Sequence, residues 1–319
     1  MSLPEKIVIA HRGASGYLPE HSLVAKAYAH ALGTDYVEMD VVLTHDGVPV
    51  VLHDLYLDCI SNIQQVYPDR CRPDGHYYVI DFNWSELERL TAYDRKSPET
   101  GEALFAARYG ESTVGADIHS MAEEIELILN LNRSTGRNVG LFVEIKNPLF
   151  HTDAGMDIGK IVLETLQRYQ ITDGAIPCLV FSFESSVLKH MRFDLGCDLT
   201  MAQLIGTPGS EEDPVDDFSF YQTDEGLREI STYAQAVSPS LLELVSFSPK
   251  GMPIPGHLVE FAHKVHLCVY PYALRRDTLP DQIDERAALT FLFSVLQIDG
   301  VITDFPDSAI AFLVDNHLR

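Results

Sequence analysis

The sequence is poor in positive charge. Its 319 residues include 23 lysines and arginines against 47 aspartates and glutamates, which gives a formal net charge of −24 at pH 7. Such an acidic surface repels nucleic acids and anionic membranes, so we expect neither as a partner. An anionic substrate would also be repelled at long range, so a site for one needs local positive charge.

Long apolar runs are also missing. No stretch approaches the roughly 20 apolar residues of a membrane-spanning helix, so we expect no stable membrane insertion. The residues before His11 are too few for the charged, apolar and cleavage regions of a signal peptide. Such a start fits both the mature form of an exported protein and a cytoplasmic protein.

Cysteines are few and odd in number, and they show no zinc-finger spacing. Cys59 and Cys71 share one segment and could pair with each other. Cys178 and Cys268 lie in apolar, strand-like runs, where we expect buried thiols. The cysteines therefore predict no structural metal site.

What the sequence does contain is a regular alternation of strand-like and helix-like segments. Strands are expected at 7–10, 35–40, 140–145, 177–182, 199–205, 236–240, 266–271 and 300–303. Helices are expected at 22–32, 121–134, 156–169, 184–195, 225–235, 256–264, 282–296 and 307–317. This order predicts a closed (β/α)8 barrel, an α/β fold that spans residues 1–319 as a single domain.

Residues 55–119 break the alternation. They follow the second strand and mix proline, glycine, aspartate, tyrosine and arginine without periodicity. Segments this long are usually functional lids or small inserted units, so we expect an insertion or cap over the top of the barrel. A merely structural extension is the alternative. Ser120 and Glu123 form a capping box that marks where the barrel helix resumes.

Polar residues gather at the ends of the first two strands. His11 and Arg12 directly follow the first strand, and Glu38 and Asp40 share one face of the second because they are two residues apart. Asp46-Gly47 predicts a tight turn that places Leu52 opposite Asp40. His53 would then return to the side of the two acids.

The third strand adds Glu144 and Lys146, which also share a face. With Glu38 and Asp40, Glu144 makes a set of three carboxylates. This set suits Ca²⁺ or Mg²⁺ rather than zinc, which prefers ligand sets with histidine or cysteine. Alone, each residue has an ordinary explanation, such as a surface ion pair or a loop histidine, but their combination indicates a site.

Two histidines beside a cation site can transfer protons near neutral pH, and Arg12 and Lys146 can neutralise an anionic group. With these residues in place, the sequence resembles that of the glycerophosphodiester phosphodiesterase family. The resemblance rests on HRG at 11–13, PEHS at 19–22, E-x-D at 38–40, THDG at 44–47, VVLHD at 50–54, VEIK at 143–146, FSFE at 181–184 and GVITDFPD at 300–307. It runs from about residue 6 to the C-terminus. Residues 67–82 further resemble the periplasmic, glycerol-3-phosphate-regulon branch, which implies a periplasmic location, while a cytoplasmic one stays open.

The resemblance implies a reaction and assigns roles. His11 and His53 would be the acid/base pair, with His11 as base and His53 as acid. The substrate would be a small glycerophosphodiester, whose 2-hydroxyl attacks phosphorus before water opens the cyclic phosphate. The products would be sn-glycerol 3-phosphate and an alcohol. Further family positions are Glu20, which supports the site, Asp304, which braces the mouth of the barrel, and Tyr272 and Arg275, which lie near the substrate.

Two departures from the family pattern affect the expected substrate contacts. Phe181 stands where the fourth strand often has glutamine, and Tyr270 stands where the periplasmic branch commonly has histidine. These departures affect the preferred diester. Separately, two alternative functions stay open. One is a lysophospholipase D-like hydrolase, which would need an apolar groove near the insertion. The other is a non-catalytic surface binding protein on the same fold. We expect a monomer or a homodimer.

Overall fold

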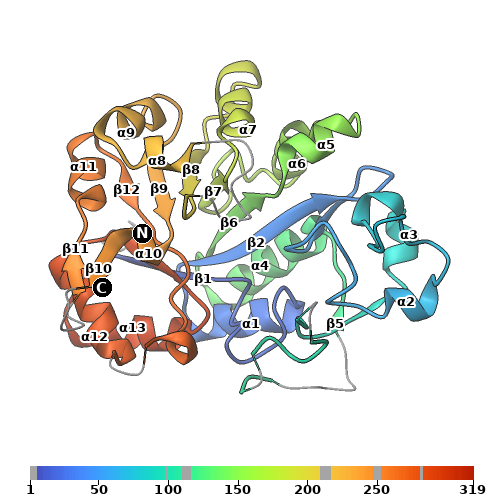
Figure 1. The fold of residues 1–319 in the computed structure, drawn as a ribbon, viewed down its shortest axis with the longest axis horizontal. Helices are drawn as coiled ribbons and strands as arrows, with labels where there is room; N and C mark the ends of the chain where they lie inside the picture. The colour runs from blue at the N-terminus through green and yellow to red at the C-terminus, as the bar shows by residue number, and fades with distance from the viewer. Residues whose placement is uncertain are drawn as a thin grey trace.

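Parallel strands form the centre of the molecule (Figure 1). The computed structural model describes residues 6–97, 100–105, 107–109, 116–208, 217–247, 253–280 and 283–319. Eight parallel strands follow one another in the order β12-β9-β8-β7-β6-β2-β1-β13. They are β1 (Ile7–Ala10), β2 (Tyr36–Leu43), β6 (Gly140–Ile145), β7 (Cys178–Ser182), β8 (Thr200–Ile205), β9 (Ala236–Pro239), β12 (Cys268–Val269) and β13 (Gly300–Thr303). The fold is the expected (β/α)8 barrel.

The barrel closes between β12 and β13 through the chain that follows β12. Backbone hydrogen bonds run from Ile302 N to Pro271 O at 3.0 Å and from Leu274 N to Ile302 O at 2.8 Å. The seventh strand is shorter than the expected 266–271. His266 has φ 62°, a left-handed conformation in which a strand cannot begin, and Pro271 has no N–H to donate to a ladder.

Side-chain alternation along the strands makes two apolar layers. Ile9, Tyr36, Phe142 and Leu204 belong to a cluster inside the barrel. Val8, Val37, Met39, Val41 and their equivalents on the other strands instead join the helices in the main core. Because Glu38 and Asp40 alternate with Val37, Met39 and Val41, they share the inner face of β2 with Tyr36.

Helices cover the outside of the barrel. They are α1 (Leu23–Leu32), α4 (Met121–Thr135), α6 (Ile158–Arg168), α7 (Ser185–Lys189), α9 (Asp224–Ile230), α11 (Leu258–Lys264), α12 (Glu285–Thr290) and α13 (Pro306–Asp315). α7 and α12 each continue into a π-helical turn, at η2 (His190–Asp194) and η4 (Phe291–Val295). The expected capping box at Ser120 and Glu123 begins α4. None of the helices in the described residues is long and apolar enough to cross a membrane.

Shorter helices and strands lie in the loops between the barrel elements. They are α5 (Pro148–Asp153), α8 (Phe218–Tyr221), α10 (Leu241–Leu244), the antiparallel pair β10 (Val245–Phe247) and β11 (Pro253–Pro255), and η3 (Arg276–Thr278). Cys59 and Cys71 are both free thiols, so the pairing considered from the sequence is not formed. Cys178 is buried as expected, whereas Cys268 is only partly buried.

The described helices of the 55–119 insertion pack beside the C-terminal end of β2 (Figure 1). The described elements of the insertion are α2 (Ile63–Val66), η1 (Val79–Asp81), α3 (Trp84–Leu87) and the antiparallel pair β4 (Thr91–Ala92) and β5 (Ala116–Asp117). Leu57, Phe82 and Leu87 form a separate small core against Val42 of β2 and its cross-strand partner Val50. The hairpin of β2 and β3 (Pro49–Val51) joins the insertion to the barrel strand that carries two candidate ligands.

Candidate active site

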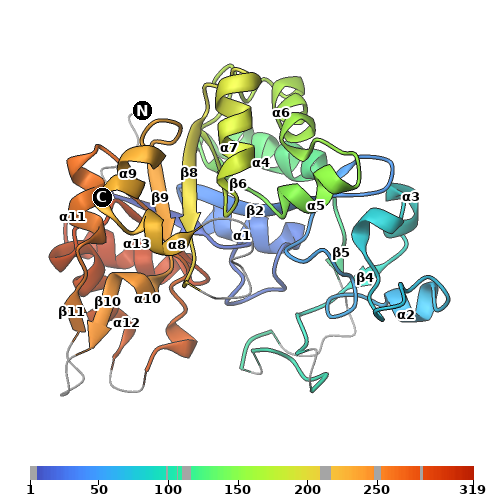
Figure 2. The same ribbon diagram turned by 45° about the horizontal axis from the view of Figure 1, so that its top comes forward.

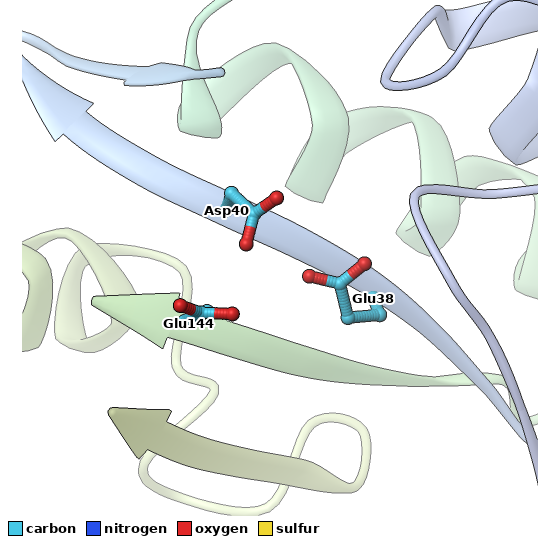
Figure 3. Close-up of side chains that lie close together, drawn as sticks. All are labelled: Glu38, Asp40 and Glu144. Atoms are coloured by element: carbon cyan, nitrogen blue, oxygen red, sulfur yellow. The ribbon is translucent and has the colours of Figure 1, made fainter. Parts of the chain in front are cut away.

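Three carboxylates converge at the mouth of the barrel (Figure 3). Glu38 and Asp40 come from β2, and Glu144 comes from β6, where it is the register partner of Asp40. Each offers an oxygen atom, and these atoms all lie within 4.8 Å of one another. The structure thus brings together the three acids that the sequence selected from two strands about 100 residues apart.

The electrostatics of this cluster favour a bound cation. Burial, then Asp40, raises the pKa of Glu38 well above its usual range. Burial also raises the pKa of Glu144 to about 8, although Lys146 opposes it. For Asp40, burial acts to raise the pKa, but Lys146 and His21 outweigh it and hold the pKa well below its usual range. Buried carboxylates this close together disfavour one another's ionisation, so a bound cation would stabilise the fully charged set.

The donor atoms fit a hard divalent cation. Glu38 Oε1 is buried and has no hydrogen-bond partner among the described residues. Its other carboxylate oxygen accepts from the backbone N–H of Arg12 at 2.5 Å. An all-oxygen set that includes such an unsatisfied ligand atom suits Ca²⁺ or Mg²⁺, because both prefer carboxylate oxygen ligands.

His11 lies at the end of β1, and a carboxylate fixes it. Its Nδ1 lies 2.6 Å from Asp304 Oδ1. Asp304, just after β13, also accepts from Arg275 Nε at 3.0 Å. Burial and then Arg12 lower the pKa of His11 to about 4, although Asp304 opposes this. A neutral ring that donates from Nδ1 presents Nε2 as its proton acceptor.

His53 is built in the same way from different elements. The expected pairing across the turn is formed, since Leu52 N donates to Asp40 O at 3.0 Å, and this returns His53 to the mouth. His53 Nδ1 lies 2.6 Å from Asp54 Oδ1. Burial, followed by Arg12 and Lys146, lowers the pKa of His53 to about 3. Two histidine–carboxylate pairs therefore border the cluster of acids.

The two expected positive groups face the same cavity as the histidines. Lys146 Nζ lies 2.7 Å from Glu144 Oε1. Arg12 donates from NH1 to Glu20 Oε2 at 2.8 Å, and its Nε lies 3.5 Å from Asp40. Arg12 has φ 56°, and Gly13 beside it has φ 86° with no room for a Cβ, which would lie 2.8 Å from Ala25 C. The HRG turn thus requires its glycine.

Tyr272 and Arg275 also line the cavity. The Tyr272 ring packs edge-on against Phe183, with centroids 5.8 Å apart. Arg275 forms an ion pair with Asp304, the carboxylate that holds His11. Its side chain therefore lies both behind His11 and at the wall of the cavity. Whether either residue contacts substrate stays a prediction.

A buried polar chain behind Asp40 was missed from the sequence. His21 Nε2 lies 2.7 Å from Asp40 Oδ2, and Lys26 Nζ lies 3.5 Å from His21 Nδ1. The fully buried Lys26 also lies 2.9 Å from Glu124 Oε1 of α4, and His119 lies 2.8 Å from the other oxygen of Glu124. A lysine inside the apolar stripe of α1 was the available sequence signal.

The cavity extends well beyond these groups. It has a volume of about 1140 Å³ and continues from His11 and His53 along an apolar wall formed by Leu244, Leu274, Leu279, Phe291 and Leu296. Figures 1 and 2 both place α10 and α12, which border it, on the opposite side of the barrel from the insertion. An apolar surface therefore adjoins the mouth on the side of α10 and α12, rather than beside α2 and α3 of the insertion, the part of the chain near which a groove was expected.

The chain is similar to known proteins along nearly its whole length. The family model for the Glycerophosphoryl diester phosphodiesterase family matches residues 11–308. The glycerophosphodiester phosphodiesterase of Haemophilus influenzae is 35% identical over 97% of this chain and 90% of that protein. The enzyme of the same name from Treponema pallidum is 30% identical over 97% of this chain and 92% of that protein.

Solved structures show the same fold. An Oleispira antarctica phosphodiesterase, in complex with the product sn-glycerol-3-phosphate, has a TM-score of 0.64 at 20% identity, covering 97% of this chain and 96% of that one. A glycerophosphodiester phosphodiesterase from Agrobacterium tumefaciens has a TM-score of 0.62 at 17% identity, covering 96% and 99%. The chain belongs to the glycerophosphoryl diester phosphodiesterase family and is a phosphodiesterase of that class.

Proposed function

We propose that the enzyme hydrolyses glycerophosphodiesters to sn-glycerol 3-phosphate and an alcohol, with a divalent cation held by Glu38, Asp40 and Glu144. The observation that carries this proposal is the convergence of these carboxylates within 4.8 Å at the barrel mouth. When bound, the cation would neutralise charge on a phosphoryl oxygen. Lys146 and Arg12 supply further positive charge in a chain that is otherwise strongly acidic.

The two histidines divide the proton transfers. His11 starts neutral and accepts the proton of the glycerol 2-hydroxyl through Nε2 as the oxygen attacks phosphorus. His53 starts protonated, which requires the anionic phosphodiester to raise its pKa above the low value of the free site, and it donates that proton to the departing alkoxide. Asp304 and Asp54 hold the two rings through Nδ1. Water then opens the cyclic phosphate with the two roles reversed, so each histidine ends in its starting protonation state.

Substrate binding falls to residues around the phosphate. Lys146 acts as a point charge on one non-bridging oxygen, and Arg12 presents its planar fork to the same group. Glu20 keeps Arg12 in place, as its hydrogen bond to Arg12 NH1 supports. Tyr272 and Arg275 shape the wall on which the glycerol or the head group lies.

The direct test is release of glycerol 3-phosphate from glycerophosphocholine. Protein treated with a chelator is titrated with Ca²⁺ and, separately, with Mg²⁺. We expect release that depends on the added ion, and Glu144→Gln should require far more of it. Equal release with and without chelator would contradict the metal site. Failure with both ions on a panel of head groups and lysolipids would contradict the assigned reaction.

A second candidate substrate is a lysophospholipid, and the apolar cavity favours it. Leu244, Leu279 and Phe291 line a space that continues directly from His11 and His53. Each buried methylene would contribute about 0.8 kcal/mol, so KM should fall as the acyl chain lengthens. Leu279→Asp should abolish this chain-length dependence. A KM independent of chain length would restrict the enzyme to water-soluble diesters.

We also propose a periplasmic enzyme that works as a monomer or a homodimer. Support for the location comes from residues 67–82, which resemble the periplasmic branch and lie in the insertion. Cell fractionation tests the location, and sedimentation of the purified protein tests the assembly. Activity confined to the cytoplasmic fraction would contradict the proposed location.

A further inference from the structure

The insertion contributes two arginines, and each contacts one of the two histidine–carboxylate pairs. Arg95 reaches Asp54, the partner of His53, and Arg108 reaches Asp304, the partner of His11. Both arginine side chains are largely buried, with 15% and 7% of their surface exposed. Neither belongs to a motif that the family resemblance used, and the reaction proposed above gives neither a role.

Arg95 connects two parts of the site. Its NH1 donates to Asp54 Oδ2, while His53 occupies the other oxygen of that carboxylate. Its Nε and NH2 donate to Glu20 Oε1 at 3.1 and 2.8 Å. Because Glu20 Oε2 in turn accepts from Arg12, Arg95 orients both the carboxylate behind His53 and the carboxylate behind Arg12.

Arg108 makes the equivalent link on the other side. Its NH1 lies 2.8 Å from Asp304 Oδ2, while His11 occupies Oδ1. Its Nε and NH2 donate to Asp277 at 2.8 and 3.0 Å, and its guanidinium lies over the Phe105 ring at 3.7 Å. A planar fork held by Asp277 and a ring can keep the Asp304 oxygen in place.

We propose that the insertion completes the catalytic centre, with Arg95 and Arg108 as positioning residues that fix Asp54 and Asp304 and, through them, His53 and His11. A histidine bound to one carboxylate oxygen keeps its ring orientation only if that carboxylate cannot rotate, and the arginine on the second oxygen prevents the rotation. This inference rests on the proposed roles of the histidines and adds the residues that hold them.

The two carboxylates are not held by the same number of arginines. Asp304 accepts from Arg275 as well as pairing with Arg108. For Asp54, the described part of the chain supplies Arg95 and no second arginine. Loss of Arg95 should therefore have the larger effect. Since Arg95 also holds Glu20, its loss should raise KM as well as lower kcat, whereas loss of Arg108 should act on kcat.

The experiment measures kcat and KM for glycerophosphocholine in Arg95→Ala, Arg108→Ala and a matched control, Arg72→Ala. Arg72 also lies in the insertion and makes a two-point ion pair, with Asp81 at 2.7 and 2.8 Å, and its side-chain contacts within the described part of the chain are with Asp81 and Tyr78 rather than with the mouth. We expect kcat/KM to fall about 10- to 100-fold in Arg95→Ala, as for other partners that orient active groups, less in Arg108→Ala, and not at all in Arg72→Ala.

Chemical rescue separates positioning from folding. Added guanidinium, well below denaturing concentrations, should restore part of kcat in Arg95→Ala and Arg108→Ala by filling the vacated position. If Arg95→Ala fails to fold, Arg95→Lys replaces it. We expect Arg95→Lys to be intermediate, because a single ammonium does not match the spacing of Asp54 and Glu20 as a fork does.

His11→Ala and His53→Ala belong in the same series. If they lose activity while Arg95→Ala and Arg108→Ala keep the wild-type kcat/KM, the positioning role is wrong and the proposed reaction stands. It is also wrong if Arg72→Ala loses as much activity as the other two, or if guanidinium restores nothing. If the histidine variants keep full turnover, the proposed reaction itself is wrong.

Discussion

The two sides of the barrel mouth differ in the interactions that hold their side chains. On the side of β1, β2, β6 and the insertion, buried charged groups are tied to one another: His11 to Asp304, His53 to Asp54, and Lys146 to Glu144. On the side of β7 to β12, the lining is largely apolar and includes Phe183 and Leu244. Charge pairing demands fixed distances, whereas apolar packing tolerates exchange of similar volumes. The first side therefore suits chemistry, and the second suits the shape of the substrate.

The largest expected effect comes from breaking the charged side at its proton donor. His53→Ala should lower kcat by about 10² to 10⁴, the usual contribution of general acid–base catalysis, and His11→Ala should do the same. Steady-state kinetics with glycerophosphocholine measures the loss. His45→Ala is the control, since His45 is an exposed histidine of the neighbouring turn. Near-wild-type turnover in folded, metal-loaded His53→Ala would remove His53 from the mechanism.

The next effect concerns stability rather than rate. Lys26 is fully buried and lies 2.9 Å from Glu124, while its Nζ also donates to Glu38 O. Lys26→Met leaves the buried Glu124 without its cation, so the free energy of unfolding should fall by about 3–5 kcal/mol. Urea denaturation measures this change, and m should stay constant.

Lys160→Met is the matched control for Lys26→Met. Lys160 pairs with Glu164 at 3.9 Å, and both side chains are 57% exposed. Loss of such an exposed pair changes stability by about 0–1 kcal/mol. Equal losses in the two variants would show that the buried chain behind Asp40 does not support the charged side.

The charged side was also the easier one to predict from sequence. His11 directly follows β1, whereas Glu38 and Asp40 lie on β2 and Glu144 lies on β6, where alternation and strand order bring side chains together. The turn at Asp46-Gly47 has a short-range signal, and it was enough to place His53 beside the mouth. The local sequence pattern was enough to predict a contact wherever strand geometry determines that contact.

Other contacts had no such signal. Arg95 and Arg108 lie in a segment without periodicity, and Arg108 meets Asp304 across 196 positions, so only the folded insertion reveals either contact. The shortened β12 depends on a left-handed His266, which residue type did not disclose. The apolar cavity joins α10, the chain after β12 and α12, and no single segment carries its pattern.

A buried histidine on the charged side should make the stability of the protein depend on pH. His151 on α5 is 1% exposed, and neither of its ring nitrogens has a hydrogen-bond partner among the described residues. Burial lowers the pKa of His151 from the usual 6.5 to about 4. Between these two values the unfolded chain binds the proton and the folded protein does not. Stability is therefore lost as the pH falls from 6.5 to 4.

His151→Leu removes this proton uptake. The unfolding free energy should then fall less steeply between pH 6.5 and 4, by up to about 1.4 kcal/mol per pH unit relative to the wild type. Urea titrations across this range measure the slope, with chelator present because metal binding itself depends on pH. His45→Leu, at an exposed position, should leave the slope unchanged. Parallel curves for wild type and His151→Leu would contradict burial of a neutral ring.

The smallest effect lies where the two sides touch. Lys146 Nζ lies 5.5 Å from the centre of the Phe183 ring. An aromatic ring of the apolar side therefore contacts the lysine ammonium of the charged side. Phe183→Leu keeps the apolar volume but removes the ring. We expect a loss of about 0.5–1 kcal/mol, seen as a few-fold lower kcat/KM for glycerophosphocholine.

Phe218→Leu is the control for that contact, because Phe218 packs against Phe183 with ring centres 5.9 Å apart and lies outside the cavity lining. If only Phe183→Leu lowers kcat/KM, the aromatic ring helps to hold Lys146 in place for the phosphate. If both variants do so equally, the loss comes from packing, and Lys146 relies on Glu144 alone. The apolar side would then affect the substrate and not the reacting groups, and the two sides could be varied independently.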